Sequence, residues 1–599
     1  MKSGRWEKEI MRKKLMLAAV CTMVLSGCSG QAEKPPVTGE TETVETSAAE
    51  TTKTTETEAT EAAGSSGTFT GTGSGYGGPV EVQVEFADGK IVDFEIVSGN
   101  ETSLLEKRAI PVLKERVLEA QSPAVDSVSG ATFTSFAVKA AIADAGSQAG
   151  LDYGQITMST QGPEAERRDL EAVQTQLVVV GGGPAGLSAA IAAKEAGVED
   201  VILIEKLDIL SGNGKFDMNF FDLINSQAMK EAGIEITKEE FIESKSTAMD
   251  SEERKVAWAE GEYELDEWLR GMGAELNQSN GGTNHMAEKD AYAGEEIQDA
   301  LEAKAIELGI DIRTGTKGLD LIMEDDRVTG VKVQNKNDYY DIMADVVILA
   351  TGGFSHNKEL LAQYAPGSET VATSNQMGAT GDFVPLFEQY GFKLENMDNL
   401  SVFKMILKPR RDLTGAGDGF ILVNENGERF VDETSSGLPL AHTILEQPNG
   451  KVFYIYDETL YETSYRLEKH NKLGYHVQAD TLEELAEKLG IPAENLTAAV
   501  DSFNQSANGE AEDPFRKEAF SRPFNEAGPY YGAQVESAIH MTKGGVVANE
   551  KAQVLFEDGS VVEGLYAAGE VTATTGAYSA AVVFGRISGQ EAAGEILGQ

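Results

Sequence analysis

The sequence predicts an α/β chain with a smaller α+β domain near its N-terminus. Three observations lead to this prediction. Residues 67–146 hold two runs of alternating apolar residues, followed by two helical patterns. From residue 174 an apolar run, a glycine-rich turn and an alanine-rich run follow one another, as a β-strand, turn and α-helix do. Far along the chain, "DVVILATGGF" and "GLYAAGEVT" are typical of buried strands that end in small residues.

Length and charge limit the class of protein. The chain has 599 residues, of which 41% are hydrophobic, and this suffices for several domains with large cores. The formal net charge is −48. A surface this acidic argues against nucleic acid and against anionic membrane surfaces as partners.

The first 27 residues are expected to be an export signal. Arg12, Lys13 and Lys14 precede the short apolar run "LMLAAVCTMVL", which ends in "LSGC". This ending resembles the bacterial lipobox and implies a diacylglycerol anchor on Cys28 at the extracytoplasmic face of the cell membrane. The alternative is an ordinary secretory signal with an incidental cysteine, and Met11 is a possible second start.

Cysteine usage agrees with export and lipidation. The sequence holds only two cysteines, Cys21 and Cys28. Cleavage would remove the first and lipidation would occupy the second. The mature chain would then have no disulfide, no cysteine metal site and no CxxCH haem attachment.

The segments before residue 174 are expected to comprise a disordered tether, a folded domain and a linker. Residues 28–66 are rich in Thr, Glu, Ala and Ser, so we expect a disordered tether. Within 67–146, "VEVQVEF" and "KIVDFEIV" flank "ADG", which predicts a β-hairpin, and "SLLEKRAIPVLKERVLEAQ" and "FAVKAAIADAG" have helical spacing. Residues 147–173 are expected to be a polar linker.

The glycine-rich turn "VVVGGGPAGLSAA" carries Gly181, Gly183 and Gly186 in GxGxxG register. Glycines at these positions allow a tight turn, a close approach of the backbone to a pyrophosphate and close packing of helix on strand. Glu205 ends the next predicted strand, where a carboxylate can accept hydrogen bonds from a ribose. The pattern predicts dinucleotide binding; the alternative is a glycine-rich turn of another α/β protein.

Several distant motifs together resemble the fumarate reductase/succinate dehydrogenase flavoprotein family. They are "ATGG", "GLYAAGE", "EKLDILSGN", "GATGD", "GFILVNENGERFVDE" and "HMTKGG". The resemblance implies a Rossmann-like domain for non-covalent FAD over 174–365 and 526–599, with an inserted α+β capping domain over 366–525. The cofactor-binding residues that it implies are Gly181, Gly183, Ala185, Gly186, Glu205, Gly212, Asn213, Thr351, Gly352, Gly353, Asp382, Glu570 and Ala577.

The stretch "DSVSGATFTS" resembles the flavinylation motif of FMN-binding domains, so residues 67–146 are expected to form such a domain. In that family a flavin transferase joins the FMN phosphate to a threonine hydroxyl. The match places the bond on Thr132, with Thr134 as the second choice and Asp126 as a residue that holds Mg²⁺ or the turn during transfer. The alternative is a turn that caps the following helix.

The substrate side departs from the family pattern. "AGDGFILVN" has Ala416 where relatives have an arginine that donates the proton, and "GEVTATTGAYSAAVVFGR" lacks a second arginine that clamps a carboxylate. His540, Tyr578 and Arg411 are therefore the expected catalytic residues. His540 and Tyr578 could instead be structural, and the basic run that also holds Lys404, Lys408 and Arg410 could be solvated.

The expected function is an extracytoplasmic FMN/FAD reductase. Electrons from a membrane quinone or NADH dehydrogenase would reach FMN and then FAD, and hydride would pass to the C=C of a small unsaturated carbonyl compound. The missing arginines favour a monocarboxylate, enone or steroid-like ketone over fumarate. The alternatives are a dehydrogenase of ketosteroid-like substrates and a non-catalytic flavolipoprotein for electron transfer or ligand binding.

Overall fold

The computed structural model describes residues 66–75, 78–99, 101, 103–159, 166–210, 212–215, 220–245, 248–279, 282–287, 292–415, 417–574 and 578–598. The predicted export signal, Cys28 and all of the predicted tether except residue 66 lie outside these ranges. Among the described helices, none has both the length and the apolar character needed to span a membrane.

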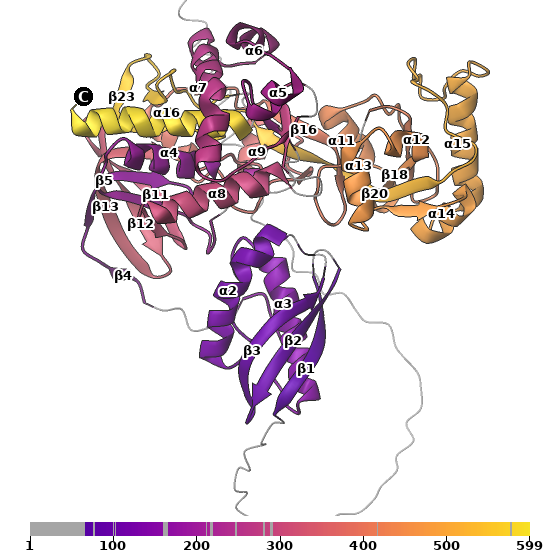
Figure 1. Ribbon diagram of the computed structural model, residues 1–599, viewed down its shortest axis with the longest axis horizontal. Helices are drawn as coiled ribbons and strands as arrows, with labels where there is room; N and C mark the ends of the chain where they lie inside the picture. Colours follow the sequence, from indigo (N-terminus) through magenta and orange to yellow (C-terminus); the bar gives the residue numbers. More distant parts are fainter. Residues whose placement is uncertain are drawn as a thin grey trace, which may run out of the picture. The chain divides into compact units, whose positions relative to one another are not determined.

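The N-terminal part of the described chain is a three-stranded antiparallel sheet with two helices (Figure 1). The predicted hairpin is confirmed, because Ala87 pairs with Lys90 across a two-residue turn. Asp88 and Gly89 have φ of 50° and 74°, the left-handed backbone that such a turn needs. The elements are β1 (Gly67–Ser74), β2 (Pro79–Ala87), β3 (Lys90–Ser98), α2 (Ser103–Ala120) and α3 (Thr132–Gln148).

Helix α3 lies unusually close to strand β1. A Cβ on Gly71 would stand 2.1 Å from the carbonyl oxygen of Ala141, and one on Gly73 would stand 2.0 Å from that of Ala137. Glycine therefore permits this packing. The core of the domain also includes Leu151 and Tyr153, so the start of the predicted linker packs on this domain.

The central sheet has nine strands in the order β10-β6-β5-β13-β12-β23-β22, with β11 on β12 and β4 on β13. β5 is parallel to β6 and to β13, and β13 is parallel to β23, so the two late apolar runs do return to one sheet. The strands are β4 (Arg168–Asp169), β5 (Val173–Val180), β6 (Val201–Ile204), β10 (Asp311–Arg313), β11 (Thr316–Glu324), β12 (Arg327–Asn335), β13 (Asp338–Leu349), β22 (Gln553–Leu555) and β23 (Val561–Ala567).

The two faces of this sheet have different cores. Leu177 and Val179 of β5 pack with residues of the helices on one face, and Val178 and Val180 pack with the β11–β13 side and the two short helices α9 and α10. The helices are α4 (Pro184–Glu195), α7 (Glu252–Gly271), α8 (Ala293–Glu307), α16 (Tyr578–Leu597), α9 (Lys358–Tyr364) and α10 (Val384–Tyr390), and α4, α8 and α16 lie together in Figure 1. Smaller elements on the helical side are η1 (Asn213–Lys215), β7 (Phe221–Asp222), β8 (Gln278–Ser279), β9 (Asn284–Met286), α5 (Gln227–Ala232) and α6 (Lys238–Ser244).

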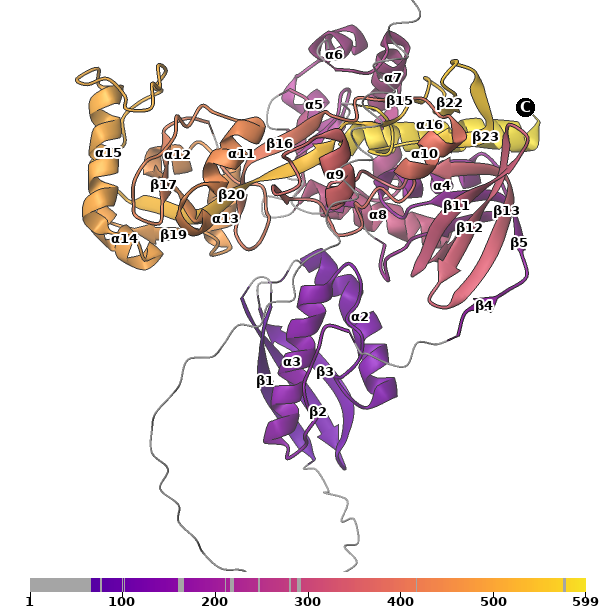
Figure 2. The ribbon, with the colours of Figure 1, turned by 180° about the vertical axis from the view of Figure 1, so that it is seen from behind.

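A second, six-stranded sheet forms the cap, with the order β14-β20-β18-β17 and with β16 and β19 on β20 (Figure 2). Its strands are β14 (Ala372–Thr373), β16 (Leu400–Leu407), β17 (Phe420–Asn424), β18 (Val452–Asp457), β19 (Val477–Ala479) and β20 (Tyr530–Thr542). Its helices are α11 (Gly437–Leu445), α12 (Glu458–Tyr461), α13 (Tyr465–Lys472), α14 (Leu482–Leu489) and α15 (Ala493–Ala507).

Strand β20 carries the chain from the cap to the central domain. It pairs with β18 and β19 at Tyr530 and still pairs with β16 at Thr542, so the cap sheet extends past the boundary expected at 525/526. The sequence offered no signal for this, because a 13-residue strand looks the same whichever sheet it joins. Its far end brings His540 to the cavity between the two domains.

Candidate functional site

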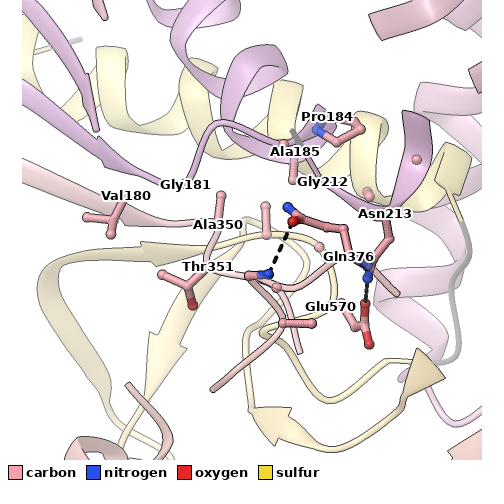
Figure 3. Close-up of a pocket in the computed structure, with 18 of the residues that line it drawn as sticks. Val180, Gly181, Pro184, Ala185, Gly212, Asn213, Ala350, Thr351, Gln376 and Glu570 are labelled. Atoms are coloured by element: carbon pink, nitrogen blue, oxygen red, sulfur yellow. Dashed lines mark hydrogen bonds between the residues drawn. The ribbon is translucent and has the colours of Figure 1, made fainter. Parts of the chain in front are cut away.

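A cavity of ≈ 370 Å³ lies where the carboxyl ends of β5 and β6 meet the first turn of α4 (Figure 3). Parallel strands deliver their carboxyl ends to one edge of a sheet, and ligands of open α/β sheets bind outside that edge. Residues of the cap close the other side, among them Ser401 of β16 and His540 and Met541 of β20.

Glycines shape the floor of the cavity. A Cβ on Gly186 would lie 1.9 Å from the carbonyl oxygen of Gly181, and one on Gly181 would lie 2.2 Å from that of Ala350. Gly183 is the N-cap of α4 and supplies no capping side chain, and Pro184 follows at the first helical position. The helix N-terminus therefore presents backbone N–H groups to the cavity without a competing side chain.

Glu205 lies at the edge of the cavity with its carboxylate held by backbone amides. Its Oε2 accepts a hydrogen bond from Gly182 N at 2.9 Å, and its Oε1 accepts one from Leu207 N at 2.9 Å. A carboxylate has further lone pairs, so it can still accept hydrogen bonds from a ribose. This is the position expected for it from the sequence.

Asp382 also lines the cavity, between two lysines. Lys206 Nζ stands 2.6 Å from one carboxylate oxygen and Lys317 Nζ 2.7 Å from the other. Burial alone would raise the pKa of Asp382, but the two ammonium groups hold that pKa below its usual range. The carboxylate is therefore ionised at neutral pH and fixes both lysines at the cavity wall.

Glu570 and Asn213 join two distant segments across the cavity, as Figure 3 shows. Asn213 Nδ2 donates to Glu570 Oε2 at 2.9 Å, and Thr542 N donates to Oε1 at 2.9 Å. Burial raises the pKa of Glu570 in spite of these donors. The pair ties η1 to the loop after β23.

His540 is a neutral imidazole at the cap side of the cavity. Burial, and then the charge of Arg466, lower the pKa of His540 to about 4. Its Nδ1 stands 2.9 Å from Ser374 Oγ, and its ring meets that of Phe403 edge to face at 5.8 Å. In the tautomer in which the Ser374 hydroxyl donates to Nδ1, the ring proton resides on Nε2 and the neutral imidazole can donate a hydrogen bond from that nitrogen.

Tyr578 lines the cavity at the start of α16, but its hydroxyl points to a carbonyl. The phenol donates to Gly294 O at 3.4 Å, and the ring packs edge to face on Phe221 at 5.1 Å. Burial raises the pKa of this phenol far above its usual value, which disfavours proton release. The ring therefore shapes the cavity wall, and a catalytic role for the hydroxyl stays a prediction.

Most side chains of the basic run in the cap contact other residues of the protein rather than solvent alone. Arg411 Nη1 donates to Asn375 O at 3.0 Å, next to Gln376 of the cavity wall. Arg410 stacks on Tyr475, with 3.8 Å between the guanidinium carbon and the ring centre. Lys404 donates to a backbone carbonyl at 2.7 Å, whereas Lys408 pairs with a glutamate at the surface. Neither Arg410 nor Arg411 lines the cavity, so a catalytic role for Arg411 also stays a prediction.

In the N-terminal domain, the two candidate threonines have different surroundings. Thr132 is the first residue of α3 and is partly exposed, with its Oγ1 4.0 Å from Met377 Sδ. Thr134 is buried and donates a short hydrogen bond to Glu101. The helix N-cap, Ala131, makes no side-chain capping bond, so the hydroxyls of the motif do not serve as the cap. Of the two hydroxyls, that of Thr132 is the accessible one.

Most of the predicted cofactor-binding residues meet in one place. Gly186 and Gly353 lie behind the wall rather than on it, and Ala577 and Ala416 lie outside the described residues. The predicted residues that line the cavity are Gly181, Gly183, Ala185, Glu205, Gly212, Asn213, Thr351, Gly352, Asp382, Glu570, His540 and Tyr578.

Sequence reasoning missed four polar groups of the site. Lys317 is on β11 and Gln376 precedes the "GATGD" segment, and both reach the cavity. Ser374 orients His540. Lys206 could have been found, because it follows Glu205 in the quoted "EK" pair, but the other three have no motif and their positions depend on tertiary packing.

Comparison with known proteins agrees with this geometry. Residues 176–581 match the family model described as FAD binding domain, and residues 75–147 match the one described as FMN-binding domain. A probable fumarate reductase of Shewanella frigidimarina is 33% identical over 70% of this chain and 75% of its own length. A urocanate reductase of Eggerthella lenta is 30% identical over 89% of this chain and 93% of its own length. The open conformation of a flavocytochrome c3 fumarate reductase superposes with a TM-score of 0.63 and 31% identity, over 71% of this chain and 79% of that one.

The residues present fit an adenine-bearing flavin. The glycine floor leaves no room for a side chain, as the Cβ distances at Gly181 and Gly186 show, and the amides at the start of α4 suit a pyrophosphate. FAD is bound here and FMN by the N-terminal domain. The chain thus belongs to the FAD binding domain family, carries an FMN-binding domain as well, and is a flavin-dependent oxidoreductase acting on CH–CH groups.

Proposed function

We propose that this protein reduces the C=C bond of an α,β-unsaturated carbonyl compound at the outer face of the cell membrane, to which a lipid on Cys28 anchors it. The observation that carries the reaction is the neutral, oriented imidazole of His540 at the cap side of the FAD cavity. Fumarate and urocanate reductases among its relatives support the reaction class.

His540 would activate the alkene by binding the carbonyl that is conjugated to it. When the β-carbon accepts hydride, negative charge develops on the carbonyl oxygen, and a donor aimed at that oxygen lowers the barrier. Ser374 holds the imidazole in place from the opposite ring nitrogen. Because this imidazole is neutral, it stabilises the charge by hydrogen bonding, and the proton for the α-carbon comes from another group.

When bound, reduced FAD supplies the hydride from its N5. The protein's own residues shield the cavity from water: Tyr578 lines it on the α16 side with Phe221 packed on its ring, and His540 lines it on the cap side with Phe403 packed on its ring. Exclusion of water strengthens the hydrogen bond from His540, since a low dielectric screens it less.

Electrons would enter through FMN attached to Thr132, delivered by a membrane quinone or NADH dehydrogenase. The attachment would need a flavin transferase, which joins the FMN phosphate to the threonine hydroxyl. The partly exposed Oγ1 of Thr132, at the start of α3, supports this assignment. Covalent attachment also suits an extracytoplasmic enzyme, because free flavin is dilute there and a reversibly bound FMN would dissociate.

The test is anaerobic reoxidation of the dithionite-reduced, flavinylated protein. Acrylate, crotonate, cinnamate, fumarate, urocanate, the methyl esters of the first three, cyclohexenone and androstenedione are each added, and the flavin absorbance is followed. We expect rapid reoxidation by at least one enoate or enone, with the saturated compound as product. Reoxidation by none of them would contradict the proposal, as would reduction of the oxidised protein by a saturated steroid, which would identify a dehydrogenase.

A further inference from the structure

One arginine of the cap, near His540, has no anionic partner among the residues that the structure describes. Arg466 is the second residue of α13, and its Nε is shielded from solvent. No hydrogen bond or ion pair connects Arg466 to any other residue in the part of the chain that the structure describes. A shielded guanidinium nitrogen without an acceptor costs free energy, and an anionic ligand would compensate for it.

Aromatic rings place this guanidinium next to His540. Its carbon lies 5.7 Å from the ring centre of Phe403 and 5.8 Å from that of Phe220. The same Phe403 ring is 5.8 Å from the His540 ring. Phe220 precedes Phe221, which packs on the cavity residue Tyr578. Arg466 thus lies where the cap meets the helical side of the central domain, one aromatic ring away from the cavity residue His540, although it does not line the cavity itself.

Other cap arginines show what a satisfied guanidinium looks like here. Arg522 makes two hydrogen bonds of 2.6 and 2.7 Å to the carboxylate of Asp457. Arg429 donates to both carboxylate oxygens of Glu433 at 2.9 Å and to Asp513 at 2.8 Å. Arg466 has no such carboxylate among the residues that the structure describes.

We infer that Arg466 binds the carboxylate of the substrate, and that the substrates are therefore unsaturated acids with an apolar stem. A guanidinium matches a carboxylate with two parallel N–H donors, and the rings of Phe403 and Phe220 favour an apolar stem beside it. The inference deepens the proposed function and rests on it. It narrows the monocarboxylate, enone or steroid-like ketone expected from the sequence to an acid.

The inference is tested by ligand binding to the oxidised holoenzyme, without turnover. Acrylate, crotonate and cinnamate, and the methyl ester of each, are titrated while the flavin absorption spectrum is recorded. We expect Arg466→Met to raise the Kd of at least one acid by about 10- to 100-fold, the usual loss for a charged hydrogen bond, and to change the Kd of its ester less than about twofold. Arg466→Lys should recover part of the affinity for the acid, because it keeps the charge but not the paired donors.

Lys472→Met is the matched control, because it removes an exposed cation from the same helix. It should leave every Kd unchanged. Flavin content and the unfolding temperature of each variant establish that it is folded. Equal weakening of acid and ester by Arg466→Met would indicate a structural cation–π role, and the absence of any effect, or of acid binding to the wild type, would also overturn the inference.

The two proposals can fail separately. If Arg466→Met weakens binding of an acid but not of its ester while no compound reoxidises the reduced protein, the carboxylate site stands and the reductase proposal is wrong. If an enone or ester reoxidises it and Arg466→Met changes neither rate nor affinity, the reductase proposal stands and the carboxylate site is wrong.

Discussion

The dinucleotide end of the cavity and its cap end are built differently. At the dinucleotide end the charged groups already have partners: backbone amides hold Glu205, and two lysines hold Asp382. At the cap end Arg466 has neither a hydrogen bond nor an ion pair within the described residues, and His540 has only Ser374. The protein itself satisfies the charges of the first end, whereas the second leaves donors that we propose a substrate occupies.

The largest expected effect concerns the dinucleotide end of the cavity. Gly186→Ala should abolish FAD binding, because the new Cβ would lie 1.9 Å from the carbonyl oxygen of Gly181, inside the turn of α4. FAD content of the purified protein, measured by absorbance and by release on denaturation, checks this. Gly594→Ala is the control: it is in helix α16 with nothing within 4 Å of a Cβ, and should stabilise the protein by about 0.5–1 kcal/mol. Full FAD content in Gly186→Ala would show that the turn is not rigid.

A second all-or-none effect concerns the N-terminal domain. Thr132→Ala should remove covalent FMN, since it removes the accessible hydroxyl, and mass spectrometry of the peptide that holds residue 132 would show the unmodified mass. Thr134→Val should keep FMN and lose about 1–3 kcal/mol of stability, because it removes the buried hydrogen bond from Thr134 to Glu101. The reverse result would move the attachment to Thr134.

At the cap end, His540→Ala should lower kcat by about 10²–10³ while FAD content is unchanged, as expected for one donor to a developing oxyanion. Ser374→Ala, which removes only the partner of the imidazole, should lower kcat by about tenfold or less. Rates with whichever compound reoxidises the protein give both numbers. An unchanged kcat in His540→Ala would leave this histidine with a structural role.

The last prediction concerns stability rather than activity, through its dependence on pH. The pKa of His540 is about 4 in the folded protein against its ordinary value near 6.5, so the unfolded chain binds the additional proton between these values. The stability that a neutral His540 contributes is fully present above about pH 6.5 and is lost as the pH falls through 4, a loss of about 3 kcal/mol.

Unfolding by urea at a series of pH values would show this as a difference in slope. Between pH 6.5 and 4, the free energy of unfolding should fall more steeply in the wild type than in His540→Gln. His470 and His476, whose pKa values burial also lowers, are present in both proteins and cancel in the comparison. Equal slopes would mean that His540 is not desolvated.

The sequence by itself determined the dinucleotide end and the hairpin of the N-terminal domain. Gly181, Gly183 and Gly186 could be found from their spacing because they act through the local backbone, where a side chain would collide with a neighbouring turn. Asp88 and Gly89 could be found in the same way, since a two-residue turn needs their left-handed backbone. Because these constraints act between residues close in sequence, they can be recognised in short stretches of the sequence.

Only the tertiary structure decided the cap end. Ser374 and Arg466 come from separate segments of the chain, and each gains its role from what packs next to it rather than from its neighbours in sequence. The hydroxyl of Tyr578, a catalytic candidate by sequence, donates instead to the carbonyl of Gly294. Electrostatic interactions and desolvation depend on the distances between residues that are far apart in the sequence, and only the folded structure sets those distances.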